Sequence, residues 1–394
     1  MRVENVVVGS NHLWRDTVKV GLHAFGEHLL RRGCAIEWLT IPFSLVLLLS
    51  PKQMSFKLRR LARSLGSPWR EQAGMGRITN RIPLTLLHPL PGVPFLESYF
   101  ASRSYLGWRI VPLPTLAKRD GVFPVVMLLF DAGGINVYYE FARRASVVVH
   151  RVNDLVAEFP HPIRGRVECE REIIRKADIL LPVSGPIHEE VIRLRGSAEG
   201  VHLLPNGVNL DLFSVAAPCP PEYAAIPEPR AVLVGTFSGW YDWDLLRQVA
   251  QMRPGVSFCL VGRDSAPDMG LENVYVLGAR SPEQVPGYMQ HASVGLIPFS
   301  DCPRIRRVER PLKFYEYIAS GLPVVSVPYG ALSSMAPGVL FGRSPGEFAE
   351  ALDAALRVTP EERVALRRAA RQFSWETIFE RFEAILGEQG IGLG

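Results

Sequence analysis

Short apolar runs alternate with longer amphipathic stretches along most of this chain. The runs are rich in β-branched residues, which is typical of buried strands, and the stretches between them carry apolar residues at helical spacing. Such alternation predicts parallel sheets with helices on both faces. The strands predicted in the first half are residues 5–8, 36–40, 125–130, 147–149 and 179–182, and those in the second half are residues 231–235, 257–261, 274–277, 294–297 and 323–327.

The length of 394 residues favours two domains, because it exceeds what one hydrophobic core normally organises. A turn-rich segment, Leu204–Asn209, leads into a proline-rich stretch at 218–229, and we place the domain boundary there. The prediction is an α/β protein with two Rossmann-like, doubly wound parallel-sheet domains. They span residues 1–205 and 206–370, and a helix at 371–394 packs back towards the N-terminal domain.

Composition excludes several classes of protein. With 47% hydrophobic and 21% charged residues the chain is predicted to be globular, and a net charge of +5 permits contact with phosphates or an anionic membrane. The five cysteines are scattered, which argues against a disulfide framework or a zinc site and fits a reducing cytoplasm. The N-terminal sequence MRVENVVVGS predicts a first strand and not a signal peptide, and no apolar run is long enough to cross a bilayer. Dinucleotide-binding and Walker glycine motifs are absent, as is any nucleic-acid motif.

Residues 309–325, ERPLKFYEYIASGLPVV, predict a helix that starts near Pro311 and ends at Gly321 before an apolar strand. Lys313 and Glu316 then share one face near the helix start, where free N–H groups and the helix dipole favour a phosphate. Lys313 would meet a pyrophosphate, and Glu316 would accept hydrogen bonds from ribose hydroxyls. The alternative is a plain surface ion pair. Lys313 is the only lysine in the C-terminal half of an arginine-rich chain, which favours a specific role.

The sequence PLKFYEYIASGLPVV at 311–325 resembles the donor-nucleotide motif of GT-B glycosyltransferases, and NGVNLDLF at 206–213 resembles their interdomain linker. Within that fold the chain is most similar to bacterial exopolysaccharide glucuronosyltransferases of the xanthan-assembly type. Those enzymes carry Arg-x-x-Asp after an N-domain strand, which Arg151 and Asp154 match in VVVHRVND. FDAG at 130–133 and VGTFS at 234–238 add to the resemblance.

The resemblance implies two domains that face a cleft, with a nucleotide-sugar donor, most simply a UDP-sugar, held by the C-terminal domain. The acceptor would be a glycan or polyprenyl-linked glycolipid in cell-surface polysaccharide synthesis. The donor-binding residues implied are Gly235, Phe237, Ser238, Arg280, Pro298, Leu312, Lys313 and Glu316. Those implied at the acceptor or in the cleft are His12, Asp131, Gly133, His150 and Arg151.

Asp154 is predicted to be the catalytic base. It would lie in a loop after a parallel strand, where ligands of such sheets bind, and would take the proton of the attacking hydroxyl in an inverting displacement. Capping of a helix by Asp154 is the alternative, and His150, Asp131 and His12 are the rival bases. The loop GTFSGWYD at 235–242 lacks the cations that the large retaining GT-B family places there, which leaves Lys313 to hold the phosphates.

No histidine cluster offers ligands for a metal, so we expect a metal-independent reaction without a cofactor. Two other function classes remain open on the sequence. A GT-B-fold sugar-nucleotide epimerase would keep the donor motif and would need further carboxylates around the sugar. A non-catalytic protein that binds sugar nucleotides would keep the fold and lose the base.

Residues 43–70, FSLVLLLSPKQMSFKLRRLARSLGSPWR, predict peripheral contact with the inner face of the cell membrane. As a helix from Met54, the segment places Met54, Leu58, Leu61 and Leu65 on one stripe and Arg59, Arg60 and Arg63 on the opposite one. The adjoining leucine run and Trp69 favour a lipid surface. An ordinary surface helix packed on its own domain is the alternative.

Overall fold

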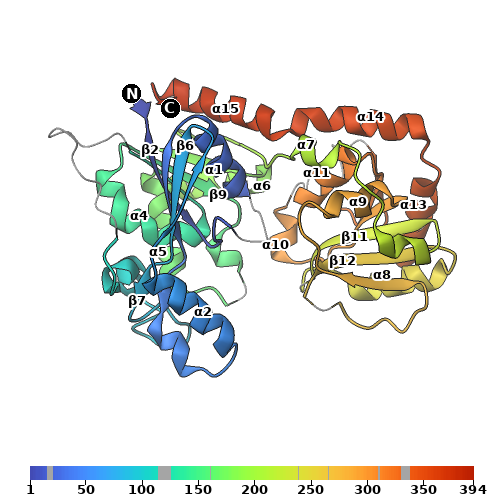
Figure 1. Cartoon of the computed structure of the whole chain (residues 1–394), viewed down its shortest axis with the longest axis horizontal. Coiled ribbons are helices and arrows are strands. Elements are labelled where there is room, and N and C mark those ends of the chain that lie inside the picture. Colours follow the sequence, from blue (N-terminus) through green and yellow to red (C-terminus); the bar gives the residue numbers. More distant parts are fainter. Residues whose placement is uncertain are drawn as a thin grey trace. The chain divides into compact units, whose positions relative to one another are not determined.

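A computed structural model describes residues 1–15, 21–113, 126–159, 161–237, 239–264, 266–308, 311–329 and 338–394. These residues form two compact units (Figure 1). Unit 1 comprises Met1–Pro205 and Phe379–Gly394, and unit 2 comprises Asn206–Ile378. Each unit is built on its own sheet, with helices on both faces.

Unit 1 contains a seven-stranded sheet in the order β10-β9-β8-β2-β3-β6-β5. All neighbouring strands are parallel except β5 and β6, which pair antiparallel at the edge. The five strands predicted in this half are present, and β5 and β6 are additional. The strands are β2 (Asn5–Ser10), β3 (Ala35–Thr40), β5 (Trp69–Ala73), β6 (Gly76–Arg81), β8 (Val126–Phe130), β9 (Val147–Val152) and β10 (Ile179–Pro182).

Helices cover the unit 1 sheet and bury its valine, leucine and isoleucine side chains. The helices of unit 1 are α1 (Gly21–Arg31), α2 (Met54–Leu65), α3 (Tyr99–Ser104), α4 (Ile135–Phe141), α5 (Arg164–Lys176), α6 (Gly185–Arg195) and, from Phe379 on, α15 (Trp375–Glu388). Short 3-10 turns lie at Leu45–Leu49, Tyr105–Trp108, Ala132–Gly134, Ala142–Arg144 and Val156–Glu158, and the short strands β4 (Phe43–Ser44) and β7 (Leu84–Thr85) pair in parallel. Of the unit 1 helices, α2 packs on these two short strands and not on the seven-stranded sheet.

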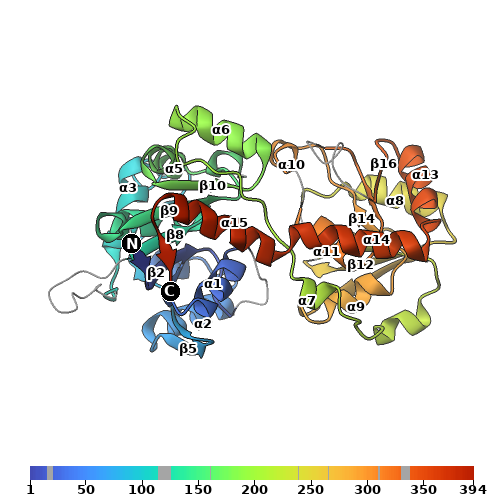
Figure 2. The ribbon, with the colours of Figure 1, turned by 90° about the horizontal axis from the view of Figure 1, so that it is seen from above.

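The end of the chain belongs to the core of unit 1. Phe25 of α1 packs edge-on against Phe379 and Phe382 of α15, with ring centroids 5.2 and 5.0 Å apart. Strand β17 (Gly392–Leu393) then pairs in parallel with β1 (Arg2–Val3), so the two termini lie side by side (Figure 2). The last residues of the sequence therefore complete a hydrophobic core that the first residues begin.

Unit 2 contains a six-stranded, fully parallel sheet in the order β13-β12-β11-β14-β15-β16. The chain starts at the central strand β11, winds outward to β13, and then returns to β14 and winds the other way. The point where this direction reverses, between β11 and β14, is where doubly wound sheets bind their ligands. The strands are β11 (Arg230–Thr236), β12 (Ser257–Arg263), β13 (Val274–Gly278), β14 (Val294–Ile297), β15 (Val324–Ser326) and β16 (Val339–Phe341).

Two hydrophobic layers cover the unit 2 sheet. One is formed with α8 and α13, and the other with α9, α11 and α14. The five strands predicted in this half are present, and β16 is additional. The helices of unit 2 are α7 (Leu210–Phe213), α8 (Trp243–Met252), α9 (Val285–Gln290), α10 (Pro303–Arg306), α11 (Leu312–Ala319), α13 (Pro345–Leu356) and α14 (Pro360–Ala370), with 3-10 turns at Pro221–Ala225 and Arg371–Phe373.

The helix predicted from Met54 is present as α2. Leu61 packs against a small cluster that includes Phe43 and Leu84. Arg60, on the opposite stripe, also contacts the unit, because its guanidinium donates to the carbonyl of Ile41 at 2.9 Å. Trp69 lies on β5. The helix thus contacts its own unit through Leu61 and Arg60.

Several apolar side chains of α2 and its surroundings nevertheless stay exposed. Eleven of the sixteen large hydrophobic side chains that are exposed in the described part of the chain fall between residues 49 and 111. We use the name α2 surface for ten of them, which are exposed on α2 or on segments near it in the sequence: Leu49, Phe56, Leu58, Leu65, Leu86, Val93, Phe95, Phe100, Ile110 and Val111. Within the described residues, every helix is too short or too polar to span a bilayer.

Candidate active site

The carboxyl-terminal edge of the unit 2 sheet opens between β11 and β14. The two strands pair only through Ala231 with Val294 and Val232 with Gly295. Beyond these pairs the strands lead into loops that are held together, because the N–H of Asp242 donates to the carbonyl of Pro298 at 2.8 Å. Gly235 and Pro298 therefore lie at neighbouring strand ends, at the reversal point of the sheet.

Helix α11 carries the predicted donor-binding pair in its first turns. Lys313 and Glu316 form an ion pair with each other, with side chains 30% and 16% exposed. The helix follows Pro311, and no side chain caps its start. The pair lies on one helix face as predicted. Each side chain is accessible enough to exchange its partner for a ligand, so the ion pair itself does not decide between a surface bridge and a binding site.

The loop after β11 has a constrained backbone. A Cβ atom at Gly235 would collide with the hydroxyl of Tyr241, so only glycine fits there. Phe237 was expected to contact the donor, but its ring is buried and packs edge-on against Trp243, with centroids 5.5 Å apart. The side chain of Phe237 therefore packs in the core beneath the loop that follows β11. Ser238 lies outside the described residues.

Arg280, also predicted to bind the donor, has partners of its own within unit 2. It follows β13, the outermost strand on its side of the sheet. Its guanidinium donates to the hydroxyl of Tyr288 and to a carboxylate oxygen of Glu222, both at 2.6 Å. Arg280 thus fastens the 3-10 turn at 221–225 to α9. Leu312, the first residue of α11, is half-buried beside Lys313.

In unit 1, the loops after β2 and β8 pack closely together. The carboxylate of Asp131 accepts a hydrogen bond from the N–H of Gly133 at 2.8 Å. A Cβ at Gly133 would overlap side-chain atoms of Asn11, so Asn11 would have to move to admit any other residue. Asp131 is 8% exposed, and its burial raises the pKa of the carboxyl group to about 7, against the opposing effect of its backbone hydrogen bonds.

Asp154 lies in the loop after β9 and is partly exposed. Its negative charge contributes to the raised pKa of Asp131, so the two carboxyl groups interact. Of the two, Asp154 is more accessible to a substrate, whereas Asp131 has a structural task in the turn that it caps. The structure thus brings together two of the candidate bases at the ends of neighbouring strands.

Helix α5 supports both of these loops from beneath. The carboxylate of Glu170 accepts from the N–H of Val156 at 2.8 Å, two residues after Asp154. The guanidinium of Arg166 donates to the carbonyl of Ala132 at 2.9 Å, next to Asp131. Burial raises the pKa of Glu170 to about 8. Sequence reasoning missed both residues, because a charged helix such as α5 resembles a surface helix.

His150 and Arg151 do not line an acceptor site, contrary to expectation. Both side chains are fully buried. The His150 ring stacks on Phe130 with centroids 4.7 Å apart, and burial lowers its pKa to about 4, so it is neutral at physiological pH. Arg151 donates to the carbonyls of Leu204 and Pro205, at 2.6 and 3.1 Å, and so anchors the chain where unit 1 ends.

His12 follows β2 and is half-buried. Its N–H donates to the hydroxyl of Ser10 at 3.2 Å, and its carbonyl accepts from the indole of Trp38 at 2.8 Å. Its ring lies edge-on to His23, with centroids 6.3 Å apart. These contacts give His12 a place in an aromatic group of unit 1. Among the described residues, no cluster of three or more His, Cys, Asp or Glu side chains is arranged to hold a metal ion.

Residues 228–357 match the family model for glycosyl transferases group 1. The chain is 26% identical over 284 residues to a putative teichuronic acid biosynthesis glycosyltransferase, TuaH, of Bacillus subtilis, which covers 68% of this chain and 70% of that protein. It is also 26% identical over 265 residues to a UDP-glucuronate:glycolipid 2-beta-glucuronosyltransferase of Xanthomonas campestris, which covers 65% of this chain and 61% of that protein.

Solved structures share the fold over nearly the whole chain. The sucrose-phosphate synthase of Thermosynechococcus elongatus matches with a TM-score of 0.65 and 17% identity, covering 98% of this chain and 99% of that one. The Anabaena protein HepE, in complex with UDP and glucose, matches with a TM-score of 0.62 and 14% identity, covering 98% and 100%. The chain therefore has the GT-B fold, and its residues 228–357 are a glycosyltransferase group 1 domain.

Proposed function

We propose that this protein transfers a sugar from a nucleotide-sugar, most simply a UDP-sugar, to a glycan or polyprenyl-linked glycolipid during cell-surface polysaccharide synthesis. Unit 2 would bind the donor and unit 1 the acceptor. The observation that carries the proposal is the position of Lys313 and Glu316 on the first turns of α11, inside the matched domain and beside the reversal point of its sheet.

The chemistry of α11 suits a nucleoside diphosphate. A pyrophosphate at the uncapped start of the helix would accept hydrogen bonds from backbone N–H groups and would draw Lys313 away from Glu316. Glu316 would then accept hydrogen bonds from ribose hydroxyls. Lys313 would also offset the charge that develops on the leaving diphosphate, which is the electrostatic contribution that such transfer requires.

Asp154 is the base that this proposal assigns. As a partly exposed carboxylate at the end of β9, it can reach an acceptor hydroxyl, whereas His150 is buried and neutral. Removal of the hydroxyl proton would allow one-step attack at the anomeric carbon, with inversion. The beta linkage in the name of the Xanthomonas relative supports this course. Asp131 is the runner-up, because it follows the neighbouring strand β8 but its burial limits access.

If the acceptor is polyprenyl-linked, the sugar transfer would take place at the cytoplasmic face of a membrane. The relatives support this, since one is named for a glycolipid acceptor and the other for teichuronic acid synthesis. The α2 surface supports it as well, because exposed apolar side chains stand beside Lys52, Arg59 and Arg63, which are all exposed. Interfacial helices combine such apolar and cationic groups.

The test is calorimetric titration of the protein with UDP, GDP and ADP, followed by assays with the corresponding sugar nucleotides. We expect selective binding of UDP and slow hydrolysis of a UDP-sugar without acceptor, both unchanged in EDTA. Interconversion of the donor into its epimer would establish the epimerase alternative. Tight binding with neither hydrolysis nor transfer to a lipid-linked acceptor would establish a binding protein. Failure to bind any nucleotide would refute the proposal.

A further inference from the structure

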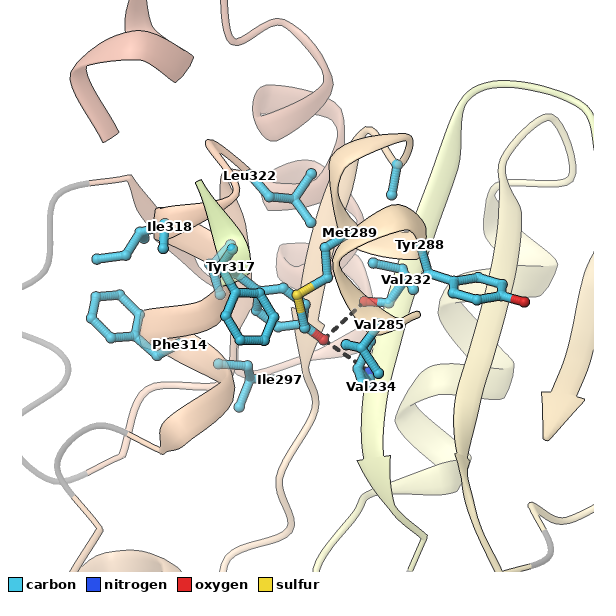
Figure 3. Packing of buried hydrophobic residues seen from close by; sticks show 14 of the residues in the cluster. Val232, Val234, Val285, Tyr288, Met289, Ile297, Phe314, Tyr317, Ile318 and Leu322 are labelled. Atoms are coloured by element: carbon cyan, nitrogen blue, oxygen red, sulfur yellow. Dashed lines mark hydrogen bonds between the residues drawn. The ribbon is translucent and has the colours of Figure 1, made fainter. Parts of the chain in front are cut away.

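Tyr317, one residue after Glu316, reaches through the core of unit 2 to the gap between β11 and β14. Its ring is fully buried. Its hydroxyl accepts from the N–H of Val234 at 2.9 Å and lies 3.2 Å from the carbonyl of Val232, both on β11 (Figure 3). It also lies 3.4 Å from the carbonyl of Leu296 on β14. One hydroxyl on α11 thus contacts both central strands of the sheet.

The hydroxyl occupies the place of a missing rung of the sheet. The last paired residues of these strands are Val232 and Gly295. In a regular parallel ladder the next bond would run from the N–H of Val234 to the carbonyl of Leu296. Both of these groups instead contact the hydroxyl of Tyr317. The backbone groups of β11 and β14 thus find a hydrogen-bonding partner in Tyr317 and do not need to pair with each other. The sheet therefore stays open between these two strands at its carboxyl-terminal edge.

Two neighbouring residues fit this arrangement. A Cβ atom at Gly295 would lie 2.7–2.8 Å from ring atoms of Tyr317, so glycine leaves the space that the ring needs. Pro298 has no N–H, so the rung after Leu296, which would run from residue 298 to the carbonyl of Val234, cannot form. Ring, glycine and proline together end the pairing of β11 with β14 at the reversal point.

We propose that Tyr317 is a positioning residue for the donor nucleotide, which acts by holding β11 and β14 apart and by fixing α11 against them. The inference rests on the proposed function. Lys313 lies one turn before Tyr317 on α11, and Gly235 follows Val234 directly. The same hydroxyl therefore sets the distance between the start of α11 and the loop after β11, the two elements assigned to the donor.

Loss of the hydroxyl has a definite structural consequence. In Tyr317→Phe the N–H of Val234 would lose its partner in a dry environment, which is unfavourable. The strands can restore the bond by closing until that N–H meets the carbonyl of Leu296. This closure would move Gly235 and Lys313 relative to each other and so misplace the groups that hold the diphosphate. Misplacement by about 1 Å is enough to weaken such a site strongly.

The test compares Tyr317→Phe with Tyr223→Phe. Tyr223 is a matched control, because it is 1% exposed in the same core cluster and donates to a backbone carbonyl, that of Tyr288, at 3.0 Å. Both variants lose one buried hydroxyl, so we expect a similar fall in Tm. Of these two variants, only Tyr317→Phe should raise the Kd for UDP, by about tenfold or more. A third variant, Gly295→Ala, displaces the ring of Tyr317 but keeps its hydroxyl, and it should also raise the Kd for UDP.

The possible outcomes distinguish failure of the inference about Tyr317 from failure of the proposed function. Equal UDP affinity in Tyr317→Phe and Tyr223→Phe would overturn the inference and leave the proposed function standing. If the wild-type protein bound no nucleotide, the proposed function would fail and the inference with it. A crystal structure of Tyr317→Phe adds a direct check, since the N–H of Val234 should lie within hydrogen-bonding distance of the carbonyl of Leu296. Unchanged strand separation there would refute the mechanism.

Discussion

Lys313 and Glu316 form an ion pair with each other across the first turns of α11, within the motif that indicates nucleotide binding. A ligand whose phosphate binds Lys313 therefore breaks this ion pair. The carboxylate of Glu316 then needs another hydrogen-bond donor. A nucleoside diphosphate meets both needs, because its phosphates take the lysine and its ribose hydroxyls donate to the glutamate. Inorganic pyrophosphate meets only the first.

The donor pair can be tested by removing each side chain separately. Lys313→Ala should weaken UDP and a UDP-sugar alike, by about tenfold or more, because a charged group facing the diphosphate is lost. Glu316→Ala should weaken UDP and leave pyrophosphate almost unchanged. Calorimetry measures both. Arg193→Ala is the control, since Arg193 and Glu190 form an ion pair of the same spacing on α6. Wild-type affinity in both test variants would show that the pair is only a surface bridge.

Asp154→Asn should lower turnover by roughly a hundred- to ten-thousand-fold, as expected for loss of a general base, with the Kd for UDP unchanged. Steady-state assays with a lipid-linked acceptor and titration with UDP measure the two quantities. Near-normal turnover would remove Asp154 from this role and direct attention to Asp131. The new anomeric centre, assigned by NMR, should be inverted relative to the donor, and retention would exclude one-step displacement.

Asp131 should make stability depend on pH. Its folded-state pKa, raised to about 7, lies above the usual value of 3.8, so the folded protein binds this proton more tightly than the unfolded chain. Its contribution is fully present below about pH 4 and is lost as pH rises through 7. Asp131→Asn removes this dependence. Denaturant unfolding should show the variant gaining stability relative to the wild type between pH 4 and pH 8, by on the order of a few kcal/mol.

The opposite trend would contradict the burial argument. If Asp131→Asn lost stability relative to the wild type as pH rose, the carboxylate would be better stabilised in the folded protein than in the unfolded chain. Glu170, whose pKa is raised to about 8, should show the same sign as Asp131 when it is changed to Gln.

Binding to a lipid surface is tested with liposomes that contain anionic lipid. The exposed cations Lys52, Arg59 and Arg63 are the ones to reverse to Glu, and Arg60 should be left intact because it hydrogen-bonds to Ile41. Co-sedimentation should be salt-sensitive and lost in this variant, while UDP binding persists. Phe56→Ser with Leu58→Ser should weaken binding without changing its salt dependence.

The control for net charge changes Arg357, Arg368 and Arg371 of unit 2 to Glu, since these residues are exposed and distant in sequence from α2. It should sediment with the liposomes like the wild type. If the wild-type protein stays in the supernatant at low salt, the α2 surface does not bind anionic lipid and this prediction is wrong.

The central strands were predictable because they are buried on both faces, so that their sequences are short, nearly unbroken apolar runs. Strand β6 is different, since its sequence GRITNR alternates buried positions with more exposed ones next to the edge strand β5 and contains no such run. The orientation of α2 was not predictable either. Its sequence carries an apolar and a basic stripe, and elements outside the helix decide their contacts. Leu61 packs on the cluster that includes Phe43 and Leu84, whereas Arg60 donates to the carbonyl of Ile41.

For the candidate site, spacing alone placed Lys313 and Glu316 on one helix face, since a helix fixes that relationship locally. Tyr317 stood in the same motif, but its contact with β11 and β14 depends on the packing of elements that are distant in sequence. The same holds for His150 and Arg151. Both occur in a motif that suggests chemistry, and both are covered by helices that the sequence could not position.

The packing of Phe379 and Phe382 on Phe25 has a consequence for how the protein is made. Synthesis on the ribosome proceeds from residue 1 onward, so the first unit emerges without the segment that completes its core. Residues 206–378 must be translated before that segment exists, and at typical elongation rates this takes on the order of ten seconds or more. During this interval the second unit can fold as a whole, whereas the first must wait with Phe25 uncovered. The unit that is begun first is thus the one that is finished last.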